Sequence, residues 1–229
     1  MKPLPILRAL RPKQWTKNGV VLAALIFAMG DTSQALGESA FPLALGRALA
    51  ATLLFCLASS AVYLVNDLRD VELDRAHPVK RLRPLAAGQI QPGTVRMLAG
   101  LLLVLALGGA AWLDPAFLAV LGAYLVLQAA YTFGLKRIAL LDIFVIATGF
   151  VLRALAGGVV IHVPISPWLL VCTLLLALFL ALCKRRHELV AAGQGETTRP
   201  SLRQYDQGLL DALIPLTGSA TLVCYSVYT

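Results

Sequence analysis

One segment between two long apolar runs is unusually dense in charged residues. The segment Asn66–Gly88 reads NDLRDVELDRAHPVKRLRPLAAG and holds four acidic and five basic residues, in a chain that is only 14% charged. If the helix that begins upstream continues at about 100° per residue, Asp67, Asp70 and Asp74 lie within roughly a 60° arc. Three carboxylates on one stripe repel one another unless a cation lies among them. The spacing therefore predicts a cation site.

The ligand types around this stripe favour a hard metal ion. Tyr63 lies on the same face and Asn66 at its edge, with no Cys and no His cluster nearby. Oxygen-only ligands favour Mg²⁺, held partly by the phosphate oxygens of a substrate. We predict Asn66, Asp70 and Asp74 as metal ligands, with Asp67 in direct or water-mediated support. The bases that follow are suited to phosphate, and they are His77, Lys80, Arg81 and Arg83. The alternative is a solvated cytoplasmic loop whose basic residues only set the membrane topology. Such a loop needs Lys and Arg but does not need aligned aspartates.

The composition indicates a membrane protein. Of the 229 residues, 59% are hydrophobic, and the mean hydropathy of +0.77 exceeds what the core of a soluble domain needs. We predict a single all-α domain over residues 1–229, a multi-pass transmembrane helical bundle, because most apolar runs approach the ~20 residues that cross a bilayer as helix. The seven predicted spans are Val20–Met29, Leu43–Val65, Val95–Leu113, Ala116–Phe133, Ala139–Ile161, Trp168–Cys183 and Leu209–Tyr228.

The basic residues follow the positive-inside rule. If the N-terminus is cytoplasmic, seven spans place every Lys and Arg on the cytoplasmic side except Arg47 and Arg153. The net charge of +8 is therefore explained by topology. We expect a lipid bilayer around the protein and no nucleic-acid partner, while assembly into a homo-oligomer stays open.

Two features could indicate export or disulfide chemistry, and both have simpler explanations. The basic arm Met1–Lys17 precedes a short apolar run, as in a signal peptide, but the arm is long and Trp15 resembles an interfacial anchor. The cysteines all lie in apolar runs without a C-x-x-C pair, which favours small buried thiols over disulfides or metal ligands. They are Cys56, Cys172, Cys183 and Cys224.

A second segment, Tyr131–Arg153, places ionisable residues in an apolar run. Lys136 belongs to a cytoplasmic basic pair, but Asp142 and Arg153 lie within or at the edge of the run. Ionisable groups there are costly and usually face a cavity or a partner. Eleven residues apart, the two share a helix face at a separation of ~16 Å, with Gly149 between them. They could contact a substrate or form a buried ion pair between helices.

Several of these motifs resemble one protein family. The pattern N-D-x-x-D-x-x-x-D resembles the first aspartate-rich motif of the UbiA superfamily of intramembrane prenyltransferases. The continuation H-P-x-K-x-x-R-P-x-A-x-G resembles one branch, the decaprenyl-phosphate phosphoribosyltransferases, as does R-P-K-Q-W-T-K-N at Arg11–Asn18. The second segment is similar to the branch pattern L-K-x-x-x-x-x-D followed by G-F-x-x-R. It departs from the two-aspartate second motif of many prenyltransferases, because position 146 is Ile.

The resemblance implies an activity and a location. Members of the superfamily usually have about nine spans, so a chain with about seven looks truncated at its C-terminus. The expected reaction is Mg²⁺-dependent transfer of a 5-phosphoribosyl group from 5-phosphoribosyl 1-diphosphate to a polyprenyl phosphate, with release of diphosphate, in cell-wall arabinose precursor synthesis. The expected location is the bacterial plasma membrane, with the N-terminus and the active site cytoplasmic.

Residue roles follow from that reaction. Asp67, Asp70 and Asp74 form the catalytic acidic face, and Tyr63 or a carboxylate would stabilise an oxocarbenium-like ribose carbon. The predicted substrate contacts are Lys17, Tyr63, His77, Lys80, Arg83, Lys136, Asp142 and Arg153. Among these, Lys17 could equally be a simple topology charge.

Two other functions remain open. An aromatic prenyltransferase would use the same aspartate face to hold a polyprenyl diphosphate. A transporter would use Asp142 and Arg153 to mark its pathway, but the sequence has no matched pair of broken helices in two halves, and its charges collect on one side.

Overall fold

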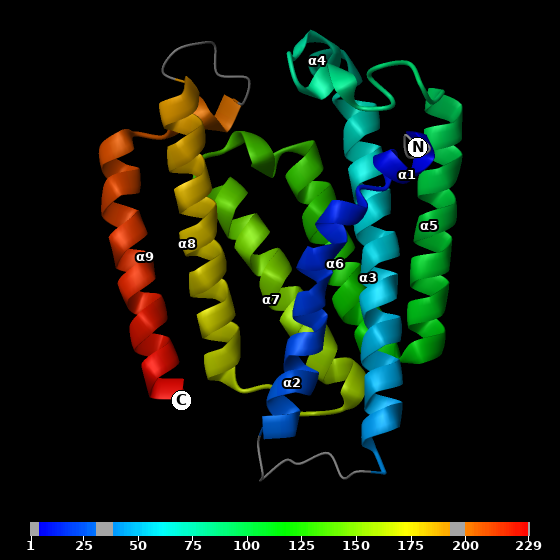
Figure 1. Ribbon diagram of the computed structural model, residues 1–229, viewed down its shortest axis with the longest axis vertical. Helices are drawn as coiled ribbons and strands as arrows, with labels where there is room; N and C mark the ends of the chain where they lie inside the picture. The colour runs from blue at the N-terminus through cyan, green and yellow to red at the C-terminus, as the bar shows by residue number, and fades with distance from the viewer. Residues whose placement is uncertain (1–4, 31–38, 193–199, 229) are drawn as a thin grey trace. The chain divides into compact units, whose positions relative to one another are not determined.

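The fold is a set of helices that run back and forth (Figure 1). The structure is a computed structural model, and it describes residues 5–30, 39–192 and 200–228. These residues contain no strand, which confirms the all-α prediction. The α-helices are α1 Pro5–Ala9, α2 Ala23–Gly30, α3 Phe41–Arg69, α4 Val71–Ala76, α5 Pro92–Leu113, α6 Pro115–Phe133, α7 Leu141–Ile161, α8 Pro167–Ala192 and α9 Gln207–Tyr228. The 3₁₀ helices are η1 Pro12–Leu22, η2 Lys80–Leu82, η3 Leu135–Arg137 and η4 Pro200–Gln204.

Six helices in the described part of the chain are long and apolar enough to cross a membrane. They are α3, α5, α6, α7, α8 and α9, and six of the predicted spans fall within them or overlap them. The predicted span Val20–Met29 is divided between η1 and α2. The polar side chain of Asn18 is buried in η1, where it donates hydrogen bonds to α3.

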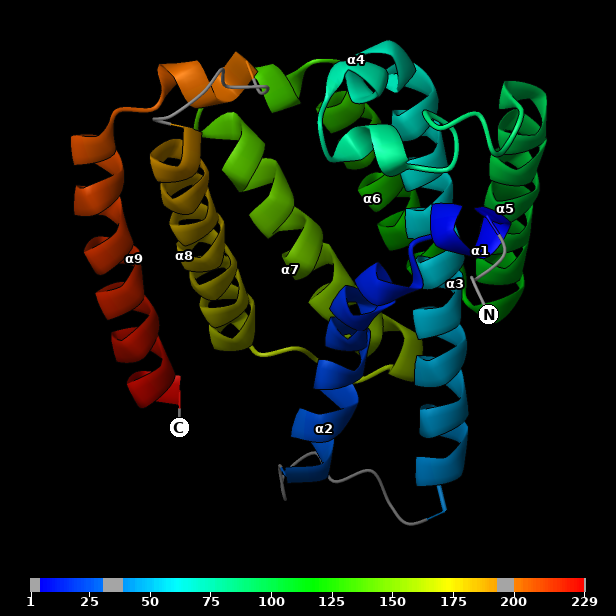
Figure 2. The same cartoon turned by 45° about the horizontal axis from the view of Figure 1, so that its top comes forward.

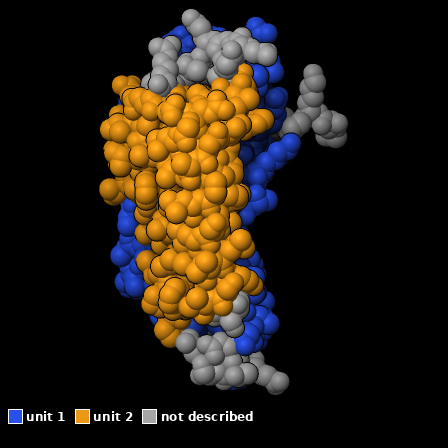
Figure 3. All heavy atoms as spheres, turned by 90° about the vertical axis from the view of Figure 1, so that its left-hand side faces the viewer, with its two compact units in different colours: residues 1–125, 156–163 blue, residues 126–155, 164–229 orange. Residues whose placement is uncertain are grey.

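The chain divides into two compact units, coloured separately in Figure 3. Unit 1 contains residues 1–125 and 156–163, and unit 2 contains residues 126–155 and 164–229. The helices α6 and α7 each contribute residues to both units.

In unit 1, α3 and α5 lie side by side (Figures 1 and 2). Small residues make this possible, because they let helix backbones approach closely. A Cβ added to Gly109 of α5 would lie 2.6 Å from the Leu54 side chain of α3. At the end of α7, a Cβ on Gly157 would lie 2.0 Å from the carbonyl oxygen of Val21 in η1. That separation is far below contact distance, so the position requires glycine.

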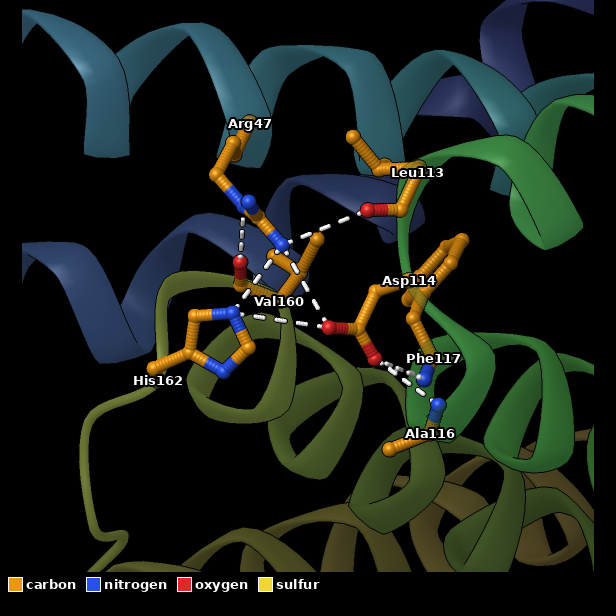
Figure 4. A network of polar contacts seen from close by, with 7 residues as sticks. All are labelled: Arg47, Leu113, Asp114, Ala116, Phe117, Val160 and His162. Atoms are coloured by element: carbon orange, nitrogen blue, oxygen red, sulfur yellow. Dashed lines mark hydrogen bonds and ion pairs between the residues drawn. The ribbon is translucent and has the colours of Figure 1, made fainter.

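Arg47, one of the two basic residues outside the positive-inside pattern, holds one end of unit 1 together (Figure 4). Its Nε donates to the carbonyl oxygen of Val160 at 2.6 Å, and its Nη2 lies 3.3 Å from both the Leu113 carbonyl oxygen and Asp114 Oδ2. His162 Nε2 lies 3.4 Å from the same carboxylate oxygen. The other oxygen of Asp114 accepts two backbone N–H groups at the start of α6. This charge therefore joins α3, the α5–α6 turn and the end of α7.

In unit 2, α8 packs along α9 (Figure 2). The core combines apolar residues of α7, α8 and α9 with Leu202 and Tyr205, which lie between α8 and α9 in the chain. All four cysteines are free thiols, and the predicted burial is confirmed for Cys56 alone. Cys56 is buried and the other three are partly buried.

Candidate functional site

The aspartate segment does not continue as one uninterrupted helix. α3 ends at Arg69, Asp70 has φ −96° and ψ 12°, and α4 begins at Val71. Backbone hydrogen bonds still cross the break, from Asp70 N to the Asn66 carbonyl oxygen at 3.0 Å and from Asp74 N to the Asp70 carbonyl oxygen at 2.8 Å. The assumption of a straight helix was therefore wrong at Asp70, because one residue there leaves helical geometry.

Asp67 and Asp74 nevertheless converge on one cation, the guanidinium of Arg83. Arg83 Nη1 donates to Asp67 Oδ1 at 3.1 Å and to Asp74 Oδ2 at 2.5 Å. The two carboxylates are 6% and 4% exposed, whereas the Arg83 side chain is 26% exposed. Sequence reasoning assigned Arg83 to phosphate, and the structure places it on the acids that were expected to hold a metal.

A second guanidinium on Asp67 comes from Arg11, which sequence reasoning did not select. Arg11 Nη2 donates to Asp67 Oδ1, and the guanidinium carbon lies 4.8 Å from the centre of the Tyr63 ring. Its backbone has φ 54° and ψ 59°, a left-handed conformation that costs a non-glycine residue roughly 1–2 kcal/mol. The only signal in the sequence was its place at the start of the R-P-K-Q-W-T-K-N segment, where topology already explained a positive charge.

The segment that carries Arg11 is held along α3 by further polar contacts. Trp15 Nε1 donates to Ser60 Oγ at 3.0 Å, and that hydroxyl donates to the carbonyl oxygen of Leu10 at 3.0 Å. One turn further, Asn18 Nδ2 donates to Ser59 Oγ at 3.1 Å. Trp15 therefore makes a hydrogen bond inside the protein, in addition to any role at the membrane interface. Lys17 is exposed on the same segment.

His77 organises the loop that leads to Arg83. Its Nδ1 accepts the backbone N–H groups of Val79 at 3.1 Å and Lys80 at 3.3 Å. An accepting Nδ1 requires a neutral ring with its proton on Nε2. Partial burial, and then the Lys80 ammonium, lower the pKa of His77 below its ordinary value. This residue is therefore neutral at pH 7 and shapes the loop.

The predicted site residues fall in both units. Unit 1 contains Lys17, Tyr63, Asn66, Asp67, Asp70, Asp74, His77, Lys80 and Arg83. Unit 2 contains Lys136, Asp142 and Arg153. Within unit 1, the contacts bring together Tyr63, Asp67, Asp74 and Arg83 through shared guanidiniums. Asn66, Asp70 and Lys80 are partly buried in the same segment.

Asp142 is the centre of a separate cluster in unit 2. Its side chain is fully buried and accepts hydrogen bonds from Arg185 Nε at 2.9 Å, Ser201 Oγ at 3.2 Å and the Tyr205 hydroxyl at 2.5 Å. The Tyr205 oxygen in turn accepts the backbone N–H of Leu140 at 2.8 Å. Burial and the hydrogen bond to Asp142 raise the pKa of Tyr205, so its hydroxyl stays protonated and donates. Asp142 therefore joins α7, α8 and η4.

The sequence left two possibilities for Asp142, a substrate contact or a buried ion pair with Arg153. The structure contains a buried ion pair, but the partner of Asp142 is Arg185. Arg153 is also buried, but its Nη1 donates to the carbonyl oxygen of Gly149 at 2.8 Å and its guanidinium lies 5.4 Å from the Phe150 ring centre. Asp142 pairs with Arg185, which lies 43 positions away in the sequence.

The acidic face has suitable ligands for a divalent cation, although a guanidinium is bound between two of them. In the described residues, no three His, Cys, Asp or Glu side chains are gathered closely enough to hold a metal ion as they stand. Asp67 and Asp74 are buried oxygen donors that already share one positive group. Carboxylate and amide oxygens suit Mg²⁺. The residues therefore fit this ion, provided that Arg83 moves aside.

The fold has a known structural counterpart. A UbiA homolog from Archaeoglobus fulgidus, solved bound to GPP and Mg²⁺, superposes with a TM-score of 0.76 at 19% identity, covering 97% of this chain and 77% of that one. The same homolog, bound to DMAPP and Mg²⁺, gives a TM-score of 0.75 at 18% identity, covering 97% of this chain and 76% of that one. These similarities show a UbiA-like helical fold.

Sequence similarity extends along nearly the whole chain. A decaprenyl-phosphate phosphoribosyltransferase from Mycolicibacterium smegmatis is 42% identical over 224 residues, which is 97% of this chain and 69% of that protein. The enzyme of the same name from Mycobacterium tuberculosis H37Rv is 40% identical and covers 97% of this chain and 73% of its own length. Residues 19–187 match the model of the UbiA prenyltransferase family, and the chain belongs to that family.

Proposed function

We propose that this chain is a decaprenyl-phosphate phosphoribosyltransferase. It would transfer the 5-phosphoribosyl group of 5-phosphoribosyl 1-diphosphate to a polyprenyl phosphate and release diphosphate. The observation that carries the proposal is 42% identity over 97% of the chain to an enzyme named for this activity. The chain is an integral membrane protein of the UbiA family, with six membrane-length helices among its described residues.

The acidic face of unit 1 would bind the donor. Asn66, Asp67, Asp70 and Asp74 are the candidate ligands of Mg²⁺, and the bound ion would neutralise the diphosphate and ease its departure. The described UbiA neighbours solved with Mg²⁺ support a divalent ion. Their identity to this chain is low, so the residue assignment rests on the buried oxygen donors described above.

Basic residues would hold the phosphates of both substrates. Lys80 and Arg83 lie in the loop after the aspartates, where guanidinium and ammonium groups can bind phosphate and stabilise charge on the departing diphosphate. Lys17 in unit 1 is proposed as a further phosphate contact. For unit 2, taken by itself, the sequence resemblance proposes phosphate contacts at Lys136 and Arg153. His77 would act by holding the loop that presents Lys80.

The transfer step needs no general base. Departure of diphosphate leaves an oxocarbenium-like ribose carbon, and an oxygen of the acceptor phosphate, already an anion, forms the new bond to it. The Tyr63 ring lies beside Asp67, since both contact Arg11, and it would stabilise the positive carbon. The polyprenyl chain would stay in the bilayer, and the reaction would take place at the cytoplasmic face of a bacterial plasma membrane.

For Asp142, we propose a supporting role in place of the substrate contact predicted from sequence. Its carboxylate already accepts hydrogen bonds from three side chains and is fully buried. It would shape the end of unit 2 that carries Lys136.

A transfer assay tests the proposal. Membranes that contain the chain would receive radiolabelled 5-phosphoribosyl 1-diphosphate, Mg²⁺ and decaprenyl phosphate, with Asp70→Asn as the control. Label should enter the lipid extract and be lost with the variant or with a chelator. The structural neighbours bound to GPP and DMAPP favour one competitor, a prenyltransferase. Consumption of a prenyl diphosphate with an aromatic acceptor, without label in lipid, would establish that competitor.

A further inference from the structure

Two arginines occupy the carboxylates that are expected to bind the cation. Asp67 accepts hydrogen bonds from both Arg11 and Arg83, and Asp74 accepts one from Arg83. These arginines come from opposite sides of the aspartates in the sequence, 56 positions before Asp67 and 16 positions after it. Two of the three aspartates are therefore paired with the protein's own positive charges.

The two partners in each ion pair differ in freedom of movement. The carboxylates are at most 6% exposed, whereas the arginine side chains are 23% and 26% exposed. Burial fixes the acids in place, while a partly exposed arginine can move without breaking the core. Arg11 also has a left-handed backbone, which that residue rarely adopts. The arginines are therefore the partners that can leave.

We propose that Arg11 and Arg83 compete with the divalent cation for Asp67 and Asp74, and that they move to the diphosphate of the donor when the cation takes the carboxylates. The first half, competition between arginine and cation, does not depend on the reaction that the protein catalyses. The second half, movement of the arginines to diphosphate, rests on the function proposed above. Arg11 thereby becomes a substrate-binding residue of the site, paired with Asp67 until the cation and the diphosphate arrive.

The exchange keeps every charge paired. A buried, ionised carboxylate without a positive partner is strongly unfavourable, so an ionised Asp67 or Asp74 is stabilised by either a guanidinium or a metal ion. A diphosphate supplies oxygen acceptors that match the planar fork of a guanidinium. The arginines therefore leave the carboxylates when the cation arrives together with the diphosphate, and the phosphate oxygens become their new acceptors.

Cation binding without any donor tests the first half of the proposal. Mn²⁺ binding would be measured by electron paramagnetic resonance on purified protein, comparing the wild type with Arg11→Gln and Arg83→Gln. Each variant removes a competitor, so Mn²⁺ should bind at least ~3-fold more tightly, since it meets a more negative site of partly reduced dielectric. Arg8→Gln and Arg75→Gln remove exposed charges from the same segments and should leave Mn²⁺ affinity unchanged.

Binding of inorganic diphosphate at saturating Mn²⁺ tests the second half. Here the same two variants should bind ~10-fold more weakly, because a charge-assisted contact is lost. The expected effects therefore have opposite signs for the two ligands. Arg11→Lys and Arg83→Lys retain the positive charge and should restore near wild-type Mn²⁺ affinity, which also gives a readout if a Gln variant does not fold.

Three results would overturn the proposal. Weaker binding of both ligands would mean that the arginines only maintain the structure. Unchanged Mn²⁺ affinity with weaker diphosphate binding would mean that they bind phosphate without competing. Tighter Mn²⁺ binding with unchanged diphosphate binding would rule out the transfer to diphosphate. The lipid-labelling assay could fail while the Gln variants still bind Mn²⁺ more tightly and diphosphate more weakly. That result would refute the phosphoribosyl reaction and leave the competition standing.

Discussion

The two aspartate clusters of this protein have the same kinds of charge and very different surroundings. In unit 1, Asp67 and Asp74 are paired with arginines that are about a quarter exposed. In unit 2, Asp142 and its partner Arg185 are 0% and 2% exposed, and two hydroxyls complete the shell. We call the first cluster the open cluster, because its arginines are partly exposed. We call the second cluster the closed cluster, because its central Asp142–Arg185 pair is buried, although Glu188, which also contacts Arg185, is 28% exposed. A buried pair suits a structural link between helices.

The largest expected effect is on the closed cluster. Asp142→Ala leaves the Arg185 guanidinium buried without that carboxylate, and removing one partner of a buried ion pair costs about 3–5 kcal/mol. The variant should lose most of its folded protein, measured as monodisperse material and melting temperature in detergent. The control Asp211→Ala breaks an exposed ion pair with Arg186 and should change little. A well-folded Asp142→Ala that has lost only substrate affinity would instead make Asp142 a substrate contact.

The open cluster should respond the other way, with activity lost and the fold retained. Asp74→Asn keeps the shape of the side chain but removes a charge that holds either Arg83 or a divalent cation. We expect phosphoribosyl transfer to fall by ~100-fold or more, a typical loss when a charge at a catalytic site is removed. Transfer of label into lipid would be measured together with the melting temperature. Glu72→Gln, an exposed acid two residues away, is the matched control and should retain activity.

A smaller effect is expected from the hydroxyl shell of Asp142. Tyr205→Phe removes one donor to the carboxylate, while Arg185 and Ser201 remain in place. A hydrogen bond to a charged group contributes about 1.5 kcal/mol or more, so the melting temperature should fall while the Michaelis constant for the donor stays constant. A change confined to the Michaelis constant would contradict a structural role for this cluster.

The smallest effect concerns pH and the loop beside the open cluster. His77 has a lowered pKa in the folded protein, so the unfolded chain binds a proton first as the pH falls. Its contribution to stability is present above the ordinary histidine pKa and is lost as the pH decreases toward the folded value. Melting temperatures between pH 7.5 and about pH 5 should therefore decline slightly more for the wild type than for His77→Ala. Equal declines would exclude this contribution.

Local sequence determined most of the fold and the position of the open cluster. Apolar run length identified spans that six described helices contain or overlap, because the distance across a bilayer sets helix length. The spacing of Asp67 and Asp74 placed both side chains on one face, because residues two helical turns apart share one side, and the two converge on Arg83. The break at Asp70 could not be predicted from helical periodicity, because periodicity does not show where a single residue leaves helical geometry.

Only the tertiary structure decided which charges meet. Arg11 contacts Asp67 across 56 positions, and Asp142 contacts Arg185 across 43 positions, although Arg153 was the nearer candidate in the sequence. Helical periodicity relates residues within one helix, while partners on different helices are selected by how those helices pack. The sequence by itself therefore determined that this is a membrane protein of UbiA type with a segment in which acidic residues are followed by basic ones. Packing decided that one aspartate cluster is paired with partly exposed arginines and the other with a buried one.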